Sequence, residues 1–595
     1  MGKFQKIKSF LKRKTIIWTT VLSMSGLVIF GFSRDEKNFE IAKNLDIYFS
    51  LFRELNLFYV DDIDPAKLVK TSIDKMLDSL DPYTNYIPES EMEEFNLMTT
   101  GEYAGIGALI GMHGENEIII SEPYEGFPAQ KAGLHAGDVI LEIDGKSTQK
   151  MTTQNVSDLL KGPVNKEVKI KILRPGTKKT IVFDLVREKI QIDAVPYYGM
   201  LDDKTGYIRL SNFTQDCSEH VRKAMVELKE KRHAKSLILD LRGNPGGLLY
   251  EAVRIANLFV PKGQEIVSTR GKVKQNDKSY YAESSALDPE IPLAVLVNSG
   301  SASASEIVAG ALQDIDRAVI IGTRTFGKGL VQTTRDLSFN TKLKVTTAKY
   351  YIPSGRCIQA LDYSHRNEDG SVGHVPDSLI SEFRTKHGRK VYNGGGVLPD
   401  IIVESSRLSN LSINLVTKNI VFDFATQYFD KVPRIADPEN FKVSEPMYNE
   451  FVEFVKQKNF TYTSGSEEAL KEVIETAKKE RYYDISEAEI KALQKKLAPN
   501  SDKDLKEFEK EIKSLIKDEI VSRYYFQKGA IKASLMEDEI LTKAIDVLHN
   551  SSKYISLLNP KSGKATSMIH RRNVKSPLYA RDNRMKIKNY TARSV

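Results

Sequence analysis

Apolar and polar residues follow different patterns in successive parts of the chain. From Phe39 to Leu80, apolar residues recur at spacings of three and four, which is the period of a helix with one buried face. From Gly101 to Lys189 they gather instead into short runs, such as Ile118 to Ile120 and Val139 to Ile143, and glycine- or proline-containing turns separate these runs. The pattern predicts a helical segment followed by a small β-rich module.

Short buried strands and helices then alternate. Tyr207 to Leu210 and Leu237 to Leu241 are apolar runs typical of core strands, and Cys217 to Lys231 between them has helical spacing. Pro292 to Val297 is another, almost wholly apolar run, and small polar residues follow it before helical spacing resumes at Ile307. This order predicts a strand, a tight turn and a helix within an α/β core.

The two ends of the chain differ from this middle part. Residues 1–14 are rich in lysine and arginine, and Thr15 to Phe32 then runs for 18 residues without a charge. This pattern is typical of a signal anchor or a long signal peptide, and we favour a cytoplasmic basic segment followed by a transmembrane signal anchor, with the rest of the chain exported. From Ser405 to Leu558 the pattern is mainly helical and strongly charged. This region could pack on the core, mediate self-association or bind a partner, and the sequence leaves the three open.

Composition narrows the classes of function. The chain has 595 residues, 41% of them hydrophobic and 28% charged, as expected of a mostly soluble globular protein with three or more domains. Lys561 to Val595 holds ten Lys or Arg and one Asp, so the remainder of a net charge of +8 sums to about −1. A nucleic-acid binder is therefore not indicated, and we expect the basic tail to be disordered. The two cysteines, Cys217 and Cys357, form neither a disulfide framework nor a metal-ligand pattern.

The turn after the third apolar run carries candidate chemistry. A serine there lies beside the first backbone N–H groups of the following helix, which have no partner within the helix and could stabilise an oxyanion. We choose Ser303 as the nucleophile. A serine needs a neighbouring base, usually histidine, but no histidine lies between His233 and His365. Lys328 could serve if burial lowered its pKa, and Gln332, four residues on, could hold the amine in place.

Two other interpretations compete with a Ser/Lys site. Gly322 to Lys328 fits the first seven positions of a phosphate-binding P-loop, but Gly329 stands where the Mg²⁺-binding Ser or Thr should be. Alternatively, the serines between Ser301 and Ser305 could form a helix N-cap, which is the usual role of serines in isolation, and the lysine could be a turn residue. Composition alone would favour this second, structural interpretation.

Five motifs decide between these interpretations. They are Ser301-Ala-Ser-Ala-Ser-Glu306, Thr325-Phe-Gly-Lys-Gly329 with Gln332, Asp240-Leu-Arg-Gly-Asn-Pro-Gly-Gly247, Tyr350-Tyr-Ile-Pro-Ser-Gly-Arg356 and Gly395-Gly-Val-Leu-Pro-Asp400. Together they resemble the carboxyl-terminal processing (tail-specific) serine peptidases, and the resemblance spans roughly Phe39 to Val403.

This resemblance implies a role for each candidate residue. The middle serine of Ser-Ala-Ser-Ala-Ser, Ser303, would be the nucleophile, Lys328 would be the general base, and Gln332 would orient the lysine. In the family, one oxyanion donor comes from the glycine-rich loop and the other from the residue after the nucleophile. These donors fall on the backbones of Gly246 and Ala304. No metal or nucleotide cofactor is implied.

A second resemblance concerns the β-rich module. Tyr103-Ala-Gly-Ile-Gly107, followed by Ala132 to Asp138, is similar to the PDZ domains of this protease type. The glycine-rich loop of such domains presents backbone N–H groups to the terminal carboxylate of a peptide, which adds as a strand to the sheet edge. The carboxylate-binding loop would then comprise Tyr103, Ala104, Gly105, Ile106 and Gly107.

The sequence therefore predicts a multidomain α+β protein in which a β-rich PDZ module precedes an α/β serine-peptidase core, with helical regions at both ends. The expected segments are 1–14 (cytoplasmic, basic), 15–32 (transmembrane signal anchor), 35–98 (N-terminal helical), 99–189 (PDZ), 190–404 (peptidase core), 405–560 (mostly helical) and 561–595 (basic tail).

The predicted function is that of a single-pass membrane endopeptidase whose catalytic part lies on the exported, periplasmic or extracytoplasmic side. A Ser/Lys dyad would cleave protein substrates that the PDZ module binds by their C-terminal tails. No nucleic-acid partner is expected, and homo-oligomer formation is left open. The alternatives are a catalytically silent PDZ scaffold of the cell envelope and an ATP-dependent protease, which the defective P-loop disfavours.

Overall fold

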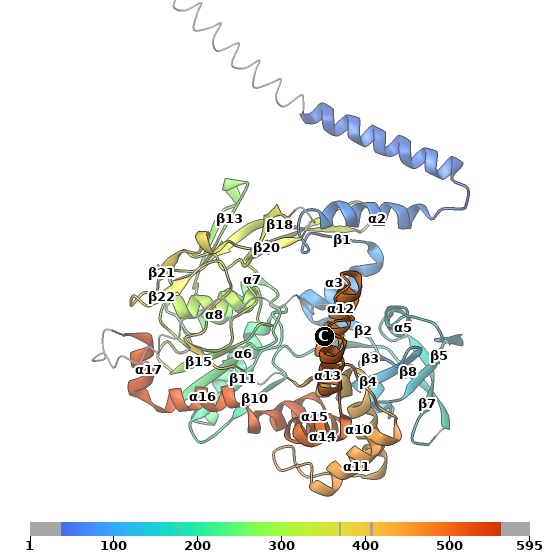
Figure 1. Cartoon of the computed structure of the whole chain (residues 1–595). Coiled ribbons are helices and arrows are strands. Elements are labelled where there is room, and N and C mark those ends of the chain that lie inside the picture. The colour runs from blue at the N-terminus through green and yellow to red at the C-terminus, as the bar shows by residue number, and fades with distance from the viewer. Residues whose placement is uncertain (1–36, 178, 368–370, 405–407, 561–595) are drawn as a thin grey trace, which may run out of the picture. The chain divides into compact units, whose positions relative to one another are not determined.

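The computed structural model describes residues 37–177, 179–367, 371–404 and 408–560 (Figure 1). The predicted cytoplasmic segment, the predicted anchor at 15–32 and the predicted disordered tail at 561–595 lie outside the described residues. Within the described ranges, no helix combines the length and the apolar character needed to cross a membrane. The chain divides into two compact units, one ending at Tyr86 and the other beginning at Ile87.

From residue 37 onward the N-terminal unit is mostly helical, as its apolar spacing predicts. One helix covers residues 37–58, and α2 (Pro65–Asp78) follows it. The break between them has a local cause, because the Asp64 side chain accepts a hydrogen bond from the Lys67 N–H at 3.1 Å and Pro65 occupies the first turn. Leu77 is the buried side chain of α2, whereas the helix before it carries many exposed apolar side chains.

The second unit begins with η1 (Glu89–Glu91) and α3 (Met92–Thr100) and continues into the predicted β-rich module. The module contains β2 (Glu102–Gly105), β3 (Ala108–His113), β4 (Glu117–Pro123), α4 (Pro128–Lys131), β5 (Val139–Ile143), β6 (Lys146–Ser147), α5 (Thr153–Leu160), β7 (Glu167–Arg174), β8 (Lys179–Val186) and β9 (Glu188–Gln191). Its sheet has the order β3-β4-β5-β7-β8, with β6 on β5, and β2 pairs separately with β9. β3 is therefore an edge strand, and α5 contacts it.

A mostly parallel sheet forms the centre of the α/β core. Its elements are β10 (Tyr197–Met200), β11 (Thr205–Arg209), α6 (Cys217–Val226), the π-helical turn η2 (Glu227–Lys231), β12 (Ser236–Asp240), α7 (Leu249–Asn257), β15 (Leu293–Val297), α8 (Ala304–Asp314), β16 (Val319–Gly322) and β23 (Ile401–Ile402). The strand order is β10-β11-β12-β15-β16-β23, with β10 antiparallel to β11 and the others parallel. Apolar side chains of α6, α7 and α8 pack in one cluster with one face of this sheet.

A second, antiparallel group of strands adjoins the core. It contains β13 (Glu265–Gly271), β14 (Lys278–Tyr281), β17 (Leu330–Asp336) and β18 (Lys342–Tyr351), with η3 (Lys274–Asn276) in the turn between β13 and β14. β18 pairs with both β13 and β17. Two small hairpins follow, β19 (Leu361–Arg366) with β20 (Val372–His374) and β21 (Glu382–Arg384) with β22 (Lys390–Tyr392), and η4 (Asp377–Leu379) lies between them.

The C-terminal region is helical, as its pattern predicts. It consists of α9 (Asn410–Thr417), α10 (Ile420–Lys431), α11 (Glu445–Gln457), α12 (Gly465–Lys479), α13 (Glu487–Leu497), α14 (Ser501–Glu507), α15 (Glu509–Ser534), η5 (Leu535–Glu537), α16 (Glu539–His549) and α17 (Ser551–Leu558). α15 is broken at Phe526, whose backbone is not helical (φ 54°, ψ −166°). Helices α9 to α11, α14 and α15 share a hydrophobic cluster of their own.

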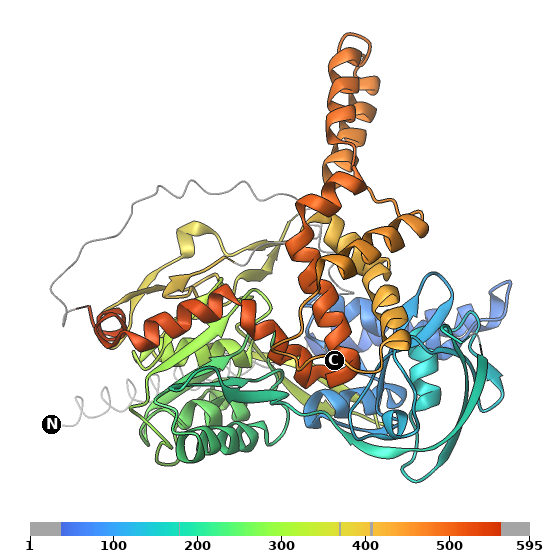
Figure 2. The same cartoon turned by 90° about the horizontal axis from the view of Figure 1, so that it is seen from below.

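This region also supplies a layer of the α/β core. Apolar side chains of α16 and α17, such as Leu541, Ala544 and Val547, pack with Tyr207 and Ile238 on the face of the central sheet opposite to α8. Both helices lie along the core in Figure 1 and Figure 2. Of the three roles that the sequence leaves open for this region, the structure therefore shows packing on the core.

The β-rich module contacts another part of the C-terminal region, at α10. His113, at the end of β3, lies 2.8 Å from the Asp423 carboxylate of α10 through its Nε2 atom, and Lys458 pairs with the other oxygen of Asp423 at 2.8 Å. Phe422 packs against Ile119 and Val139 of the module. The predicted fold class, α+β with the β-rich module before the α/β core and helices after it, is confirmed.

Candidate active site

The turn between β15 and α8 holds Ser303 in an unusual backbone conformation. Its φ of 54° and ψ of −111° lie outside the regions that L-residues favour, and the residue stands at the N-cap of α8. Asn298 supports the turn, because its Oδ1 atom accepts hydrogen bonds from the N–H groups of Gly243 at 2.9 Å and Gly300 at 3.0 Å. The strand, tight turn and helix predicted from the apolar pattern are thus present.

The three serines of the motif differ in what their hydroxyl groups do. The Ser301 hydroxyl donates to the Leu241 carbonyl at 2.8 Å and the Ser305 hydroxyl to the Asn244 carbonyl at 2.9 Å, and both side chains are fully buried. These two serines therefore hold the glycine-rich loop against the turn. Ser303 is partly exposed and is the one of the three that a substrate can reach.

Glu306, to which the sequence analysis gives no role, joins the two halves of the candidate dyad. Its buried carboxylate accepts hydrogen bonds through Oε2 from the backbone N–H groups of Ser303 and Lys328, both at 2.9 Å. Because both nitrogens donate to the same oxygen atom, the Ser303 and Lys328 backbones must lie close together. Oε1 accepts from the Gly327 N–H at 2.7 Å and the Thr325 hydroxyl at 2.5 Å. The signal in the sequence is an acidic residue three positions after an N-cap serine, which is the spacing of a capping box.

Burial dominates the electrostatics of Glu306. It raises the pKa of this carboxyl to about 7, against the four hydrogen-bond donors, which lower it. Because this pKa lies above the ordinary value of 4.5, the folded protein holds the proton more tightly than the unfolded chain. The contribution of Glu306 to the free energy of unfolding is therefore largest in acid and decreases as the pH rises through about 7.

The loop that carries Lys328 connects β16 to β17 and is held at several points. Besides the bonds to Glu306, the Gly329 N–H donates to Gln359 Oε1 at 2.7 Å and the Ala360 N–H donates to the Gly327 carbonyl at 2.9 Å. The side chain of Lys328 is half-buried. This loop leads into a strand, and two of its N–H groups bind a carboxylate, so it lacks the helix that follows a phosphate-binding P-loop.

Gln332 lies on β17, next to an irregularity in the pairing with β18 between Val331 and Gln332. Such irregularities redirect side chains. The Gln332 amide nitrogen donates to the Thr346 hydroxyl at 3.1 Å. Its predicted role in orienting Lys328 stays a prediction.

The structure brings the two predicted oxyanion donors next to the nucleophile. Gly246 has a φ of +99°, and a methyl group added to it would lie 2.9 Å from both the Ala304 nitrogen and Ser303 Cβ. No other residue type fits there without displacing the turn. The Gly246 N–H itself donates to Asn244 Oδ1 at 2.9 Å, so it is engaged within the loop in this structure. Its role as a donor stays a prediction.

A buried ion pair lies at the start of the same loop. Asp240 has no exposed surface, and the Arg242 guanidinium approaches its Oδ2 atom to 2.5 Å. Burial alone would raise the pKa of Asp240, but Arg242, with help from Arg209, outweighs burial and lowers this pKa to about 2. The Tyr207 hydroxyl also donates to Asp240, at 2.7 Å.

The five predicted residues of the PDZ carboxylate loop divide between two elements. Tyr103, Ala104 and Gly105 belong to β2, which pairs with β9, whereas Ile106 and Gly107 form the connection to β3. Gly107 has a φ of +71° and lies so close to Phe127 that a methyl group there would approach Phe127 Cβ to 2.4 Å. Because residues 106 and 107 directly precede β3, the connection lies at the start of the edge strand, to which a peptide would add.

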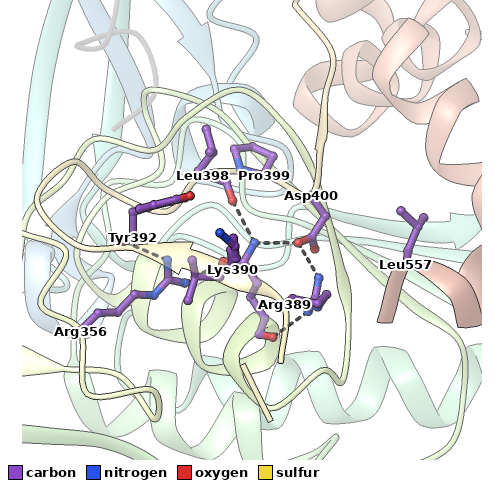
Figure 3. Close-up of a pocket in the computed structure, with 10 residues that line it drawn as sticks. Arg356, Arg389, Lys390, Tyr392, Leu398, Pro399, Asp400 and Leu557 are labelled. Atoms are coloured by element: carbon purple, nitrogen blue, oxygen red, sulfur yellow. Dashed lines mark hydrogen bonds and ion pairs between the residues drawn. The ribbon is translucent and has the colours of Figure 1, made fainter. Parts of the chain in front are cut away.

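A pocket of about 240 Å³ lies at the other end of α8 from Ser303 (Figure 3). Its charged side chains have charged partners within the lining or next to it, and Lys390, for example, binds Glu382 at 2.8 Å. Arg389 binds Asp316 at 2.6 Å and Asp400 at 2.5 Å, and Arg356 binds Asp314 at 2.8 Å. The pairs with Asp314 and Asp316 tie the pocket to the C-terminal end of α8.

Three family models match the chain in the order of its domains. Residues 119–174 match the model "PDZ domain", residues 204–364 match "Peptidase family S41", and residues 411–548 match "Probable PDZ-protease, C-terminal helical domain". Fold, site and matches together define a serine-type peptidase with a PDZ domain.

Similar proteins from other organisms identify the family. The carboxy-terminal-processing protease of Bartonella bacilliformis is 40% identical over 345 residues, which cover 57% of this chain and 76% of the relative. A probable CtpA-like serine protease of Staphylococcus aureus is 34% identical, with 58% and 68% covered. The chain belongs to the carboxy-terminal-processing proteases of peptidase family S41. Among solved structures, a photosystem II D1 C-terminal processing protease is 31% identical with a TM-score of 0.33, and the match covers 59% of this chain and 85% of that one.

Proposed function

We propose that this protein is an exported endopeptidase in which Ser303 is the nucleophile and Lys328 the general base. The observation that carries the proposal is the pair of hydrogen bonds from the Ser303 and Lys328 backbones to one buried oxygen of Glu306. A Ser/Lys pair can act only if both side chains start from fixed, adjacent backbone positions. This arrangement favours a peptidase over a catalytically silent PDZ scaffold.

In the proposed reaction, neutral Lys328 takes the hydroxyl proton as Ser303 Oγ attacks the scissile carbonyl carbon. The oxyanion forms beside the Ala304 and Gly246 backbones. The carbon–nitrogen bond then breaks, the leaving amine takes the proton from the Lys328 ammonium, and an acyl ester remains on Ser303. Water, deprotonated by Lys328, hydrolyses this ester and regenerates the serine.

The PDZ domain would select substrates by their C-terminal tails. β3 has a free edge beside α5, and the Ile106–Gly107 connection begins that edge, so a bound peptide could pair with β3 while its carboxylate meets the backbone N–H groups of the connection. This assignment predicts that the free carboxylate matters more than any one side chain.

Amidation of the C-terminus should therefore weaken peptide binding by about tenfold or more, because it removes the charge that the loop recognises. The measurement is the Kd of an apolar-ended peptide and its C-terminal amide for full-length Ser303→Ala protein, by fluorescence anisotropy. Equal affinities would mean that the domain reads something other than a chain terminus.

We also propose that residues 15–32 anchor the protein in the cell membrane with the catalytic part outside the cytoplasm. The support is the uncharged run after a basic segment. The full chain should resist alkaline carbonate extraction from membranes, and a version lacking residues 1–34 but carrying a cleavable export signal should be released. Release of the full chain by carbonate would overturn the anchor.

A further inference from the structure

We propose that Asp538, in the C-terminal helical region, is a positioning residue for the oxyanion loop, defined here as residues 242–246. Asp538 acts through the guanidinium of Arg242, which begins that loop. The proposal rests on the oxyanion role of Gly246 in the proposed function. It gives the C-terminal helical region a part in catalysis.

The contact joins parts of the chain that are far apart in sequence. Asp538 Oδ2 lies 2.7 Å from Arg242 Nη2, and the same nitrogen lies 2.5 Å from Asp240 Oδ2. Arg242 Nε also donates to Asp240, at 2.9 Å. The Arg242 and Asp538 side chains are 13% and 16% exposed, so water screens the interaction far less than at an open surface.

Displacement of Arg242 would reach the nucleophile through the loop. The Asn244 carbonyl accepts hydrogen bonds from the Ala302 N–H at 3.0 Å and the Ser305 hydroxyl at 2.9 Å. Two residues further on, Gly246 is in contact with the Ser303 turn. Oxyanion stabilisation depends on donor positions to within a few tenths of an ångström, so a small shift at the start of the loop is enough to change it.

Charge balance explains why a second carboxylate is needed. Asp240 is shared between two cations, Arg242 at 2.5 Å and Arg209 at 3.7 Å. Asp538 supplies the second negative charge, and the cluster of two carboxylates and two guanidinium groups becomes neutral. Without it, a largely buried site would carry an excess positive charge, and the Nη2 group of Arg242 would lose one of its two carboxylate partners.

Asp538 is itself held firmly. Its Oδ1 atom caps α16 by accepting a hydrogen bond from the Leu541 N–H at 3.0 Å, which leaves Oδ2 for Arg242. Leu541 is buried against the central sheet of the peptidase core. The carboxylate that fixes Arg242 is thus tied to the layer that covers this sheet.

The test is Asp538→Asn, which keeps the size of the side chain and its capacity to cap α16 but removes its charge. We expect kcat for a peptide substrate to fall about tenfold or more, because a donor is displaced but not deleted, while KM changes little. Affinity for a peptide aldehyde should fall in parallel, because its adduct with Ser303 carries an oxyanion. Asp546→Asn is the matched control, since it removes the same charge from an exposed position of α16 and should leave both quantities unchanged.

A double-mutant cycle separates positioning from general stability. Asp538→Asn should have little further effect on kcat in an Arg242→Gln background, because the residue through which it acts is already gone. Wild-type kcat and aldehyde affinity in Asp538→Asn would overturn the proposal. A fall in kcat that is undiminished in the Arg242→Gln background would also overturn it, since Asp538 would then act through the fold as a whole.

Failure of this proposal can be told apart from failure of the proposed dyad. Titration with a fluorophosphonate counts reactive serines independently of turnover, and Ser303→Ala should abolish labelling. If Ser303→Ala is still labelled, the dyad assignment is wrong. If labelling depends on Ser303 but Asp538→Asn behaves like the wild type, the dyad stands and the positioning role does not.

Discussion

Replacement of Ser303 by alanine is expected to reduce kcat by about four orders of magnitude or more, and replacement of Lys328 by alanine should reduce it by a similar factor. Each change removes one member of the proposed nucleophile–base pair, which would transfer a single proton, so neither residue should retain its catalytic role alone. The measurement is hydrolysis of a fluorogenic peptide by purified full-length protein, with circular dichroism to establish that each variant is folded.

The double variant should be no less active than either single one, because the two residues act as one unit. Lys262→Ala, at an exposed position, is the control for loss of a lysine and should leave activity unchanged. Appreciable turnover by Lys328→Ala would show that another group takes the serine proton. The assignment of the base would then be wrong even if Ser303 remained essential.

Glu306→Gln is expected to lower kcat by about a hundredfold or more. The Glu306 carboxylate accepts four hydrogen bonds, including those from the Ser303 and Lys328 backbones, whereas a glutamine offers one oxygen and adds an N–H₂ group that faces other donors. Each buried donor left without an acceptor costs about 1–3 kcal/mol, so the two loops should relax away from each other. The measurement is kcat together with the melting temperature.

The pH profile adds a second readout for Glu306. In the wild type, activity should increase as the pH rises through about 7, because Glu306 ionises there and accepts the full set of hydrogen bonds. In Glu306→Gln, the rise of activity that is due to ionisation of Glu306 should be absent from the pH profile. Glu251→Gln is the matched control, since Glu251 is a buried carboxylate that accepts from the Ser218 N–H at 2.8 Å, and it should affect stability more than kcat. A wild-type rate and pH profile in Glu306→Gln would contradict this role.

Local pattern predicted the scaffold of the site but not the bonds that tie it together. An apolar strand, small residues and renewed helical spacing predicted the turn at Ser303, and the structure has that turn. The roles of Ser303 as nucleophile and Lys328 as base stay predictions. Glu306 lies inside the motif that contains Ser303, but its importance comes from donors on a loop about twenty residues away, which periodicity does not reveal. The engagement of the Gly246 N–H by Asn244 is likewise a matter of side-chain rotation that no spacing rule describes.

The C-terminal region shows the same limit over a longer range. Its helical content followed from its periodicity, but the sequence left open what these helices pack against. The partners of Asp538 and Leu541 lie hundreds of residues earlier in the chain, and neither charge nor apolar spacing encodes that pairing. Only the three-dimensional arrangement shows that α16 completes the core and does not stand apart from it.

The layer formed by α16 and α17 is synthesised well after the sheet that it covers. The strands of the central sheet all precede residue 403, but the α16 and α17 layer that covers one of their faces is made about 140 residues later. Domains fold from the N-terminal end as the chain emerges. Until α16 and α17 arrive, apolar side chains such as Tyr207 and Ile238 lack the layer that covers them, and Arg242 lacks its second carboxylate, Asp538. If Asp538 positions the oxyanion loop as proposed, the active site reaches its finished form only after α16 has been made and has docked on the core.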